Sequence, residues 1–186
     1  PFSLPDARKN RRGVLLMPKH ALSFVLNGET VDWEVETNAT LLQALRENGV
    51  TSVKRGCEEG ECGACTVVID ELAQKSCLVL ALEVEGKSVL TVEGLPAAPG
   101  KLHPIQQAFV DEGAVQCGFC TPGFIMTTYA FLKTHPNPTD EEIRHALSGN
   151  LCRCTGYLSI IKAVKTAAEA LSKPIVAGEG GEGDVR

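Results

Sequence analysis

Eight cysteines, gathered into two groups of four, constrain this chain of 186 residues more than any other feature of its sequence. Each group combines closely spaced cysteines with distant ones, which is how the thiolate ligands of metal centres are distributed along a chain. One group lies in each half of the chain. The sequence therefore predicts two metal centres, carried by two successive folded units.

The first group has the spacing C-x4-C-x2-C-x11-C and consists of Cys57, Cys62, Cys65 and Cys77. Glycines within the loop 56–65 allow the backbone to wrap closely and to turn its N–H groups toward sulfur. The spacing is that of plant-type [2Fe–2S] ligands and differs from that of a zinc ribbon. Disulfide bonds are disfavoured, because three cysteines so close together lack the geometry for separate bridges. We therefore expect a [2Fe–2S] cluster in the first half.

The second group has the spacing C-x2-C-x31-C-x-C and consists of Cys117, Cys120, Cys152 and Cys154. This spacing alone is also compatible with a structural zinc site that has four cysteine ligands. Thr121-Pro122 follows the first pair and Thr155-Gly156 follows the second, so each pair is expected just before a helix N-terminus. The positive ends of two helix dipoles stabilise an anionic centre. This context favours a second [2Fe–2S] cluster, with zinc as the alternative.

Hydrophobic periodicity divides the chain into a β-rich first half with one helix and a helical second half. Strands are expected over 21–26, 30–36, 65–69 and 89–92, with a hairpin turn at Asn27-Gly28 and a helix capped near Asn38 or Thr40. Two prolines and a glycine in the stretch 96–100 indicate a linker. Helices are then expected over 103–113, 121–134, 139–149 (opened by a capping box at Thr139) and 157–171.

These signals predict five segments: a flexible leader (1–19), a folded unit (20–95), a linker (96–102), a second folded unit (103–173) and a disordered tail (174–186). Met17 is an alternative start, because the apolar run before Pro18 is too short for a signal-peptide core. The formal net charge of −5 gives no basic face, so a nucleic-acid partner is not expected. The apolar runs fall far short of the ~20 residues that cross a bilayer, so we do not expect an integral membrane protein.

Longer motifs around the cysteines resemble those of a known family. The motifs are Gly56–Thr66, Ser76–Leu78, Thr91–Leu95, Gln116–Gly123 and Gly149–Tyr157. Together, over residues 21–171, they resemble the iron–sulfur subunit of molybdenum hydroxylases of the xanthine oxidase family. The chain departs from the family pattern at 51–54, where Thr-Ser-Val-Lys replaces the more usual Thr-Gly-Thr-Lys, but this difference touches no cysteine.

The resemblance implies an α+β chain: an N-terminal plant-ferredoxin-like β-grasp domain followed by an all-α four-helix [2Fe–2S] domain. It also implies an electron-transfer subunit of an oxidoreductase, with no substrate chemistry and no catalytic residue of its own. Its two clusters would relay electrons from a molybdopterin-binding large subunit to an FAD-binding medium subunit or another acceptor. By the same resemblance Gln116 and Cys154 contact the pterin. We expect a cytoplasmic location, with export as part of a partner-bound complex left open.

Two other functions remain open from the sequence alone. One is a zinc-stapled interaction module with a ferredoxin-like domain attached, and the other is a stand-alone soluble ferredoxin. The histidines at 20, 103, 135 and 145 are scattered and accompany no catalytic arrangement, and His103 beside Pro104 is expected to cap a helix. No nucleotide-binding glycine loop is present, so any FAD is expected on another chain.

Overall fold

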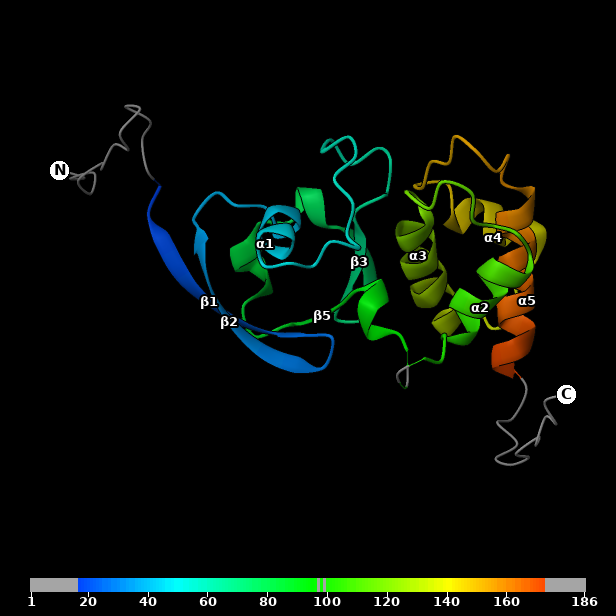
Figure 1. Ribbon diagram of the computed structural model, residues 1–186, viewed down its shortest axis with the longest axis horizontal. Helices are drawn as coiled ribbons and strands as arrows, with labels where there is room; N and C mark the ends of the chain where they lie inside the picture. Colours follow the sequence, from blue (N-terminus) through cyan, green and yellow to red (C-terminus); the bar gives the residue numbers. More distant parts are fainter. Residues whose placement is uncertain (1–16, 97, 99, 173–186) are drawn as a thin grey trace, which may run out of the picture.

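The computed structural model describes residues 17–96, 98 and 100–172. Residues 1–16 of the predicted leader and 174–186 of the predicted tail lie outside this part. Within the described residues the first half forms a five-stranded mixed sheet of order β2-β1-β5-β3-β4, with helix α1 against it (Figure 1). Its elements are β1 (Lys19–Leu26), β2 (Glu29–Glu36), α1 (Leu41–Glu47), β3 (Thr66–Ile69), β4 (Leu72–Lys75), β5 (Ser88–Leu90) and three short 3-10 helices, η1 (Ser76–Leu78), η2 (Ala81–Val84) and η3 (Val92–Gly94).

The hairpin between β1 and β2 forms at the predicted turn. Asn27 and Gly28 both have positive φ angles, 52° and 90°, as a two-residue turn of type I′ requires. The Asn27 side chain then links the turn to the chain after β5, because its Oδ1 accepts the Thr91 N–H at 2.8 Å. The turn therefore helps to hold β1 beside β5. These two strands pair in parallel.

Helix α1 covers the sheet as predicted. The Thr40 hydroxyl accepts the Gln43 N–H at 3.2 Å and caps the helix. Three leucines of α1 are fully buried in the core of the first half, namely Leu41, Leu42 and Leu45. At about 1.5–3 kcal/mol for each buried leucine side chain, this face supplies the main stabilisation of the helix.

The second half contains helices α2 (Pro104–Asp111), α3 (Thr121–Thr134), α4 (Asp140–Ala146) and α5 (Leu158–Ser172). The predicted capping box at Thr139 begins α4, and the predicted cap His103 begins α2, where it also forms a capping box with Gln106. Helix α4 ends at Ala146, earlier than predicted, with Leu147 as its C-cap residue. After the helix the chain reaches the first half, where the Leu151 N–H donates to the Cys62 carbonyl at 2.9 Å. No helix within the described residues is long and apolar enough to cross a membrane.

Strand β3 belongs to the cores of both halves. Successive side chains of a strand point to opposite faces, and here Val67 and Ile69 are buried in the core of the sheet domain. Val68, which is 3% exposed, is instead buried among the helical side chains of the second half. Helix α3 lies beside β3 in Figure 1. The linker thus separates the halves in sequence, but not in packing.

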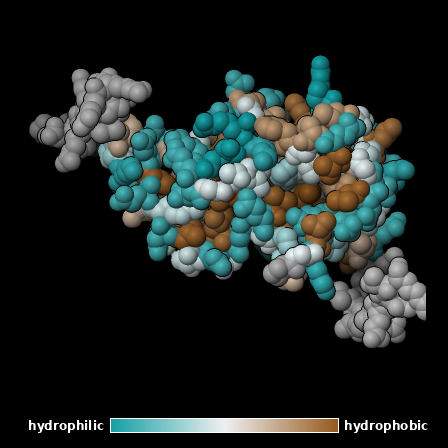
Figure 2. Space-filling model, in the orientation of Figure 1, coloured by the Kyte–Doolittle hydropathy of each residue, from teal (hydrophilic) through white to brown (hydrophobic). Residues whose placement is uncertain are grey.

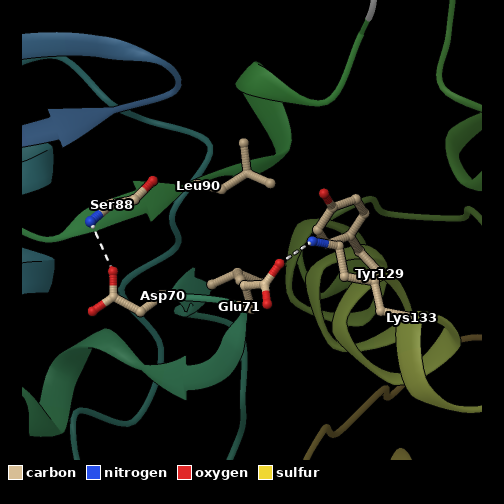
Figure 3. A pocket seen from close by; sticks show the side chains of 7 residues that line it. Asp70, Glu71, Ser88, Leu90, Tyr129 and Lys133 are labelled. Atoms are coloured by element: carbon tan, nitrogen blue, oxygen red, sulfur yellow. Dashed lines mark hydrogen bonds and ion pairs between the residues drawn. The ribbon is translucent and has the colours of Figure 1, made fainter.

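Side chains from both halves line a pocket on the surface of this junction (Figure 3). At one wall Lys133 of α3 forms an ion pair with Glu71, with 3.0 Å between Nζ and Oε1. Tyr129 lies beneath the same ammonium group, 5.1 Å from the ring centroid. The contact is exposed and stands apart from the cysteine loops.

Gly123→Ala should destabilise the protein, although alanine is the better helix former by ~1 kcal/mol. A Cβ at position 123 would overlap the Gly63 carbonyl oxygen, and the backbone cannot swing away as a side-chain end could. We expect a loss of about 1–3 kcal/mol in the free energy of unfolding, measured by urea denaturation.

The matched control is Gly149→Ala, whose Cβ would meet only the flexible end of Lys75, 3.3 Å away. This variant should stay close to the wild type. Equal stability of Gly123→Ala and the wild type would contradict the close contact between the halves.

Candidate metal centres

The β3–β4 hairpin explains the long interval between Cys65 and Cys77. The two strands pair antiparallel with Thr66 opposite Lys75, so the residues just outside the hairpin return to the same place. The Ser76 hydroxyl donates to the Cys65 carbonyl at 2.8 Å and fixes this return. As a result Cys65 and Cys77, which precede β3 and follow β4, are brought to the same end of the hairpin.

The other two cysteines of this group form a second pair in the glycine-rich loop. The Cys57 N–H donates to Cys62 Sγ and the Cys62 N–H donates to Cys57 Sγ, both at 3.4 Å. A third N–H, from Glu59, also donates to Cys57 Sγ at 3.4 Å. The bonds from Glu59 and Cys62 lower the pKa of Cys57 to about 7, which favours the thiolate that a metal requires.

Glycine at position 56 is required by this arrangement. A Cβ there would lie 2.7 Å from Cys62 Sγ, closer than two such atoms can approach. The prediction that the glycines let the backbone wrap around the sulfurs is confirmed at this position.

The two pairs of the first group differ in burial. Cys65 and Cys77 are buried, and burial, followed by the neighbouring Cys65, raises the pKa of Cys77 to about 11. Cys57 and Cys62 are partly exposed. The exposed residues beside them are Glu58, Glu59, Glu61 and Arg55, and Arg55 pairs with Glu58 at 3.2 Å. The acidic side chains therefore form a solvated rim.

The second group of cysteines also consists of two pairs. Cys117 and Cys154 are exposed, with their Sγ atoms 3.6 Å apart. Cys120 and Cys152 lie deeper, and burial, followed by the neighbouring Cys152, raises the pKa of Cys120 to about 12. Two sulfurs thus face outward and two face inward.

Thr155 donates two hydrogen bonds to a single sulfur of this group. Its N–H lies 3.4 Å and its hydroxyl 3.2 Å from Cys152 Sγ. Burial alone would raise the pKa of Cys152, but the bonds from Thr155 outweigh it and lower the pKa. Thr155 therefore stabilises negative charge on this sulfur.

Only one of the two expected helix N-termini is placed directly at a cysteine among the described residues. Cys120 is the N-cap residue of α3, as predicted. Helix α5 begins at Leu158, so Cys154 does not adjoin it. Gly156 and Tyr157 intervene with φ angles of 66° and 70°, and the Tyr157 hydroxyl accepts the Cys152 N–H at 3.0 Å. The Cys152 backbone is therefore held by a hydrogen bond within the loop that leads to α5.

The sulfur contacts can be compared with the two candidate metal centres. A [2Fe–2S] cluster places two thiolates on each of two irons. A structural zinc ion requires four ligands around one point, with sulfurs ~2.3 Å from the metal. Thiolates are the donors that a [2Fe–2S] cluster takes, and both groups of cysteines supply four of them.

Gln116, which the resemblance assigns to the pterin together with Cys154, is exposed next to Cys117. Cys154 is exposed as well. Both residues are therefore accessible to another molecule, and their contact with a pterin stays a prediction.

A direct contact between the two cysteine loops was not predicted from the sequence. The Cys62 carbonyl accepts the Leu151 N–H at 2.9 Å, and the next carbonyl, of Gly63, accepts the Asn150 side-chain amide at 3.1 Å. Both loops lie on the same side of the molecule, at the top of Figure 1. The motif containing Asn150 was visible in the sequence, but nothing in it identifies the partner of this side chain.

Comparison with known proteins agrees with this description. A family model for a 2Fe-2S iron-sulfur cluster binding domain matches residues 24–91, and one for a [2Fe-2S] binding domain matches residues 91–165. The chain is 51% identical over 154 residues to the nicotinate dehydrogenase small FeS subunit of Eubacterium barkeri, covering 82% of this chain and 98% of that one. It is 52% identical over 145 residues to the xanthine dehydrogenase iron-sulfur-binding subunit of Escherichia coli O157:H7, covering 77% and 91%.

Solved structures show the same fold. The crystal structure of quinoline 2-oxidoreductase from Pseudomonas putida 86 contains a chain that matches with a TM-score of 0.79 and 45% identity, over 82% of this chain and 95% of that one. The aldehyde oxidoreductase from Desulfovibrio desulfuricans matches with a TM-score of 0.78 and 42% identity, but over only 17% of its own chain. The same unit therefore occurs both as a separate subunit and as part of a larger chain.

The two matched domains and the paired cysteines define an iron–sulfur protein with a ferredoxin-like domain followed by a helical one. More particularly, the chain belongs to the iron–sulfur subunits of the molybdenum hydroxylase, or xanthine oxidase, family. Its part in the enzyme is that of a subunit in a multi-subunit oxidoreductase.

Thr155→Val should lower the reduction potential of the centre held by the second cysteine group. Hydrogen bonds to ligand sulfur stabilise the more negative, reduced state, and the variant loses the hydroxyl donor to Cys152 Sγ. We expect a shift on the order of tens of millivolts, where ~59 mV is a tenfold change for one electron. Redox titration followed by EPR measures it.

Thr155→Ser is the matched control, because it keeps the hydroxyl and should keep the potential. An unchanged potential in the valine variant would show that the bond from this hydroxyl is not made in the loaded protein.

Proposed function

We propose that this chain holds two [2Fe–2S] clusters and relays electrons between a molybdopterin-binding large subunit and an FAD-binding medium subunit or another acceptor. The observation that carries the proposal is the gathering of four cysteines in each half. In the first half Cys57 and Cys62 exchange N–H···S bonds and the β3–β4 hairpin returns Cys77 to Cys65. In the second half the sulfurs of Cys117 and Cys154 lie 3.6 Å apart, and Cys152 neighbours Cys120. The clusters would supply one-electron carriers with no proton or group transfer. What the chain itself does is to hold them at fixed places.

We assign the ligands by these pairs. In the first half one iron would bind Cys57 and Cys62, and the other would bind the two cysteines beside the β3–β4 hairpin, Cys65 and Cys77. In the second half the outward pair is Cys117 and Cys154, and the inward pair is Cys120 and Cys152. We propose a cytoplasmic location for the complex, because thiolate ligands persist in a reducing compartment.

The exposed edge of the second cysteine group indicates which surface of this chain would contact the large subunit. Cys117, Cys154 and Gln116 are all exposed, which is unfavourable for a cluster that must be protected from water and oxidants. Exposed apolar side chains lie close to them in the sequence, namely Val115, Phe119, Leu151 and Leu158. Apolar residues on the visible face gather mainly over the helical half (Figure 2). A large subunit that covers this edge would bury the cluster and bring Gln116 and Cys154 to its pterin.

We assign the choice of substrate to the molybdopterin-binding large subunit. The relatives belong to enzymes named for nicotinate and for xanthine, although their iron–sulfur chains are each about half identical to this one. Chains so similar that serve different substrates support a common role in electron transfer.

Metal analysis and single cysteine substitutions test the two-cluster assignment. We expect roughly four iron atoms per chain and two overlapping rhombic signals in low-temperature EPR of the dithionite-reduced protein. Cys62→Ser should remove one signal, and Cys154→Ser the other, because the two ligand sets share no cysteine.

Two results would contradict the assignment. A colourless protein, or one with half of the iron replaced by zinc, would support the zinc-stapled module. Loss of both signals from either variant while the protein remained folded would show that the two sites are not separate.

Stable association with a molybdenum-binding subunit is the second test. The chain contains a whole helical domain beyond what a single-cluster carrier of ~100 residues needs, and the outer edge of that domain is exposed. Gel filtration of native-source protein should show co-elution with larger subunits, and molybdenum in the same fractions. Elution as a free monomer would favour the stand-alone ferredoxin.

A further inference from the structure

One buried polar side chain joins the two cysteine loops. Asn150 is 5% exposed, and both ends of its amide are occupied. Its Nδ2 donates to the Gly63 carbonyl of the first half at 3.1 Å. Its Oδ1 accepts the hydroxyl of Thr127 on α3 at 2.9 Å. The side chain therefore spans the junction between the halves.

The position of this residue in the sequence places it between ligands of the two centres. Gly63 immediately follows Cys62, and Asn150 lies two residues before Cys152. The residue between, Leu151, donates its N–H to the Cys62 carbonyl at 2.9 Å. The two loop segments that contain Cys62 and Cys152 are thus held together by two neighbouring hydrogen bonds. One comes from the Leu151 backbone N–H and the other from the Asn150 side-chain amide.

Two glycines limit how closely the loops approach, while the hydrogen bonds limit how far they separate. A Cβ at Gly63 would meet the Asn150 amide, and a Cβ at Gly123 would overlap the Gly63 carbonyl oxygen. The first loop therefore already lies in backbone contact with α3 and with the second loop. The separation of the two ligand sets has little freedom in either direction.

We propose that Asn150 is a positioning residue for electron exchange between the two centres, and that its amide fixes the distance across the junction between Cys62 and Cys152. The inference rests on the proposed function, because it requires two clusters. Electron transfer between fixed centres weakens steeply with their separation, so a small loosening of this contact has a large effect on rate. Side chains that are fixed by packing and hydrogen bonds keep the distance between two sites constant, whereas mobile side chains let it vary.

The alternative is that Asn150 contributes only to stability, and a second contact across the junction separates the two roles. The ion pair between Lys133 and Glu71 also joins the halves, but it joins α3 to the turn between β3 and β4, apart from the cysteine loops (Figure 3). Lys133→Met is therefore the matched control for a bond across the junction that does not touch the ligand loops. Thr127→Val is the control for the other end of the Asn150 amide, because it leaves the bond to Gly63 in place.

The test uses the full-length, cluster-loaded chain in two variants. Asn150→Leu keeps the number and branching of the side-chain heavy atoms and loses both hydrogen bonds, whereas Asn150→Ser is too short to reach Gly63. The measurements are the magnetic splitting between the two reduced centres in EPR and the rate of electron exchange between them. Iron content, the two reduction potentials and the melting temperature are recorded in parallel. We expect the splitting to shrink and the rate to fall by about tenfold or more, with iron content and potentials retained.

Each outcome decides the proposal. If a folded variant with full iron content keeps the wild-type splitting and rate, Asn150 is a structural residue and the inference is overturned, while the proposed function stands. If both controls lose the splitting as strongly as the Asn150 variants, the inference is overturned as well. A wild-type chain that holds only one cluster would overturn the proposed function and, with it, this inference.

Discussion

The rest of the structure depends on the contacts that the carbonyl oxygen of Gly63 makes. It accepts hydrogen bonds from the Thr66 N–H and hydroxyl, at 3.1 and 2.7 Å, which turn the ligand loop into β3. It also accepts the Asn150 amide from the other half and lies against Gly123 of α3. A buried carbonyl left without donors costs about 1–3 kcal/mol. One backbone group thus closes the first ligand loop and docks the second half onto it.

Because of the contact at Gly63, the linker does not separate two independently packed units. Proline and glycine at 96–100 interrupt regular structure, and the sequence predicts two units on that ground. The alternation of β3 sends Val68 into the helical core and its neighbours Val67 and Ile69 into the sheet core. A strand that is buried on both faces cannot lose one half without exposing apolar surface. The two units are therefore distinct in topology, but they stabilise each other through the same strand.

Local signals predicted the parts of the fold that depend on neighbours in sequence. The turn at Asn27-Gly28 and the caps at Thr40, His103 and Thr139 all formed, because each depends on residues within a few positions. Strand β4 was missed, since its sequence Leu-Ala-Gln-Lys has no strand-like alternation and it is held by pairing with β3. The hydrogen bonds of Leu151 and Asn150 were missed for a related reason: their partners at Cys62 and Gly63 lie in the other half of the chain.

The burial of the sulfur pairs gives the proposed electron relay an orientation that ligand spacing alone cannot give. In the second group the outward pair, Cys117 and Cys154, is exposed, and the inward pair includes Cys152, next to the contact with Cys62. In the first group the pair that contains Cys62 is the more exposed one, and it receives three N–H donors that offset its negative charge. Burial disfavours an added electron, and donors to sulfur favour it. The two centres therefore differ in environment although both have four cysteines, and the junction joins the inner edge of one to the solvated edge of the other.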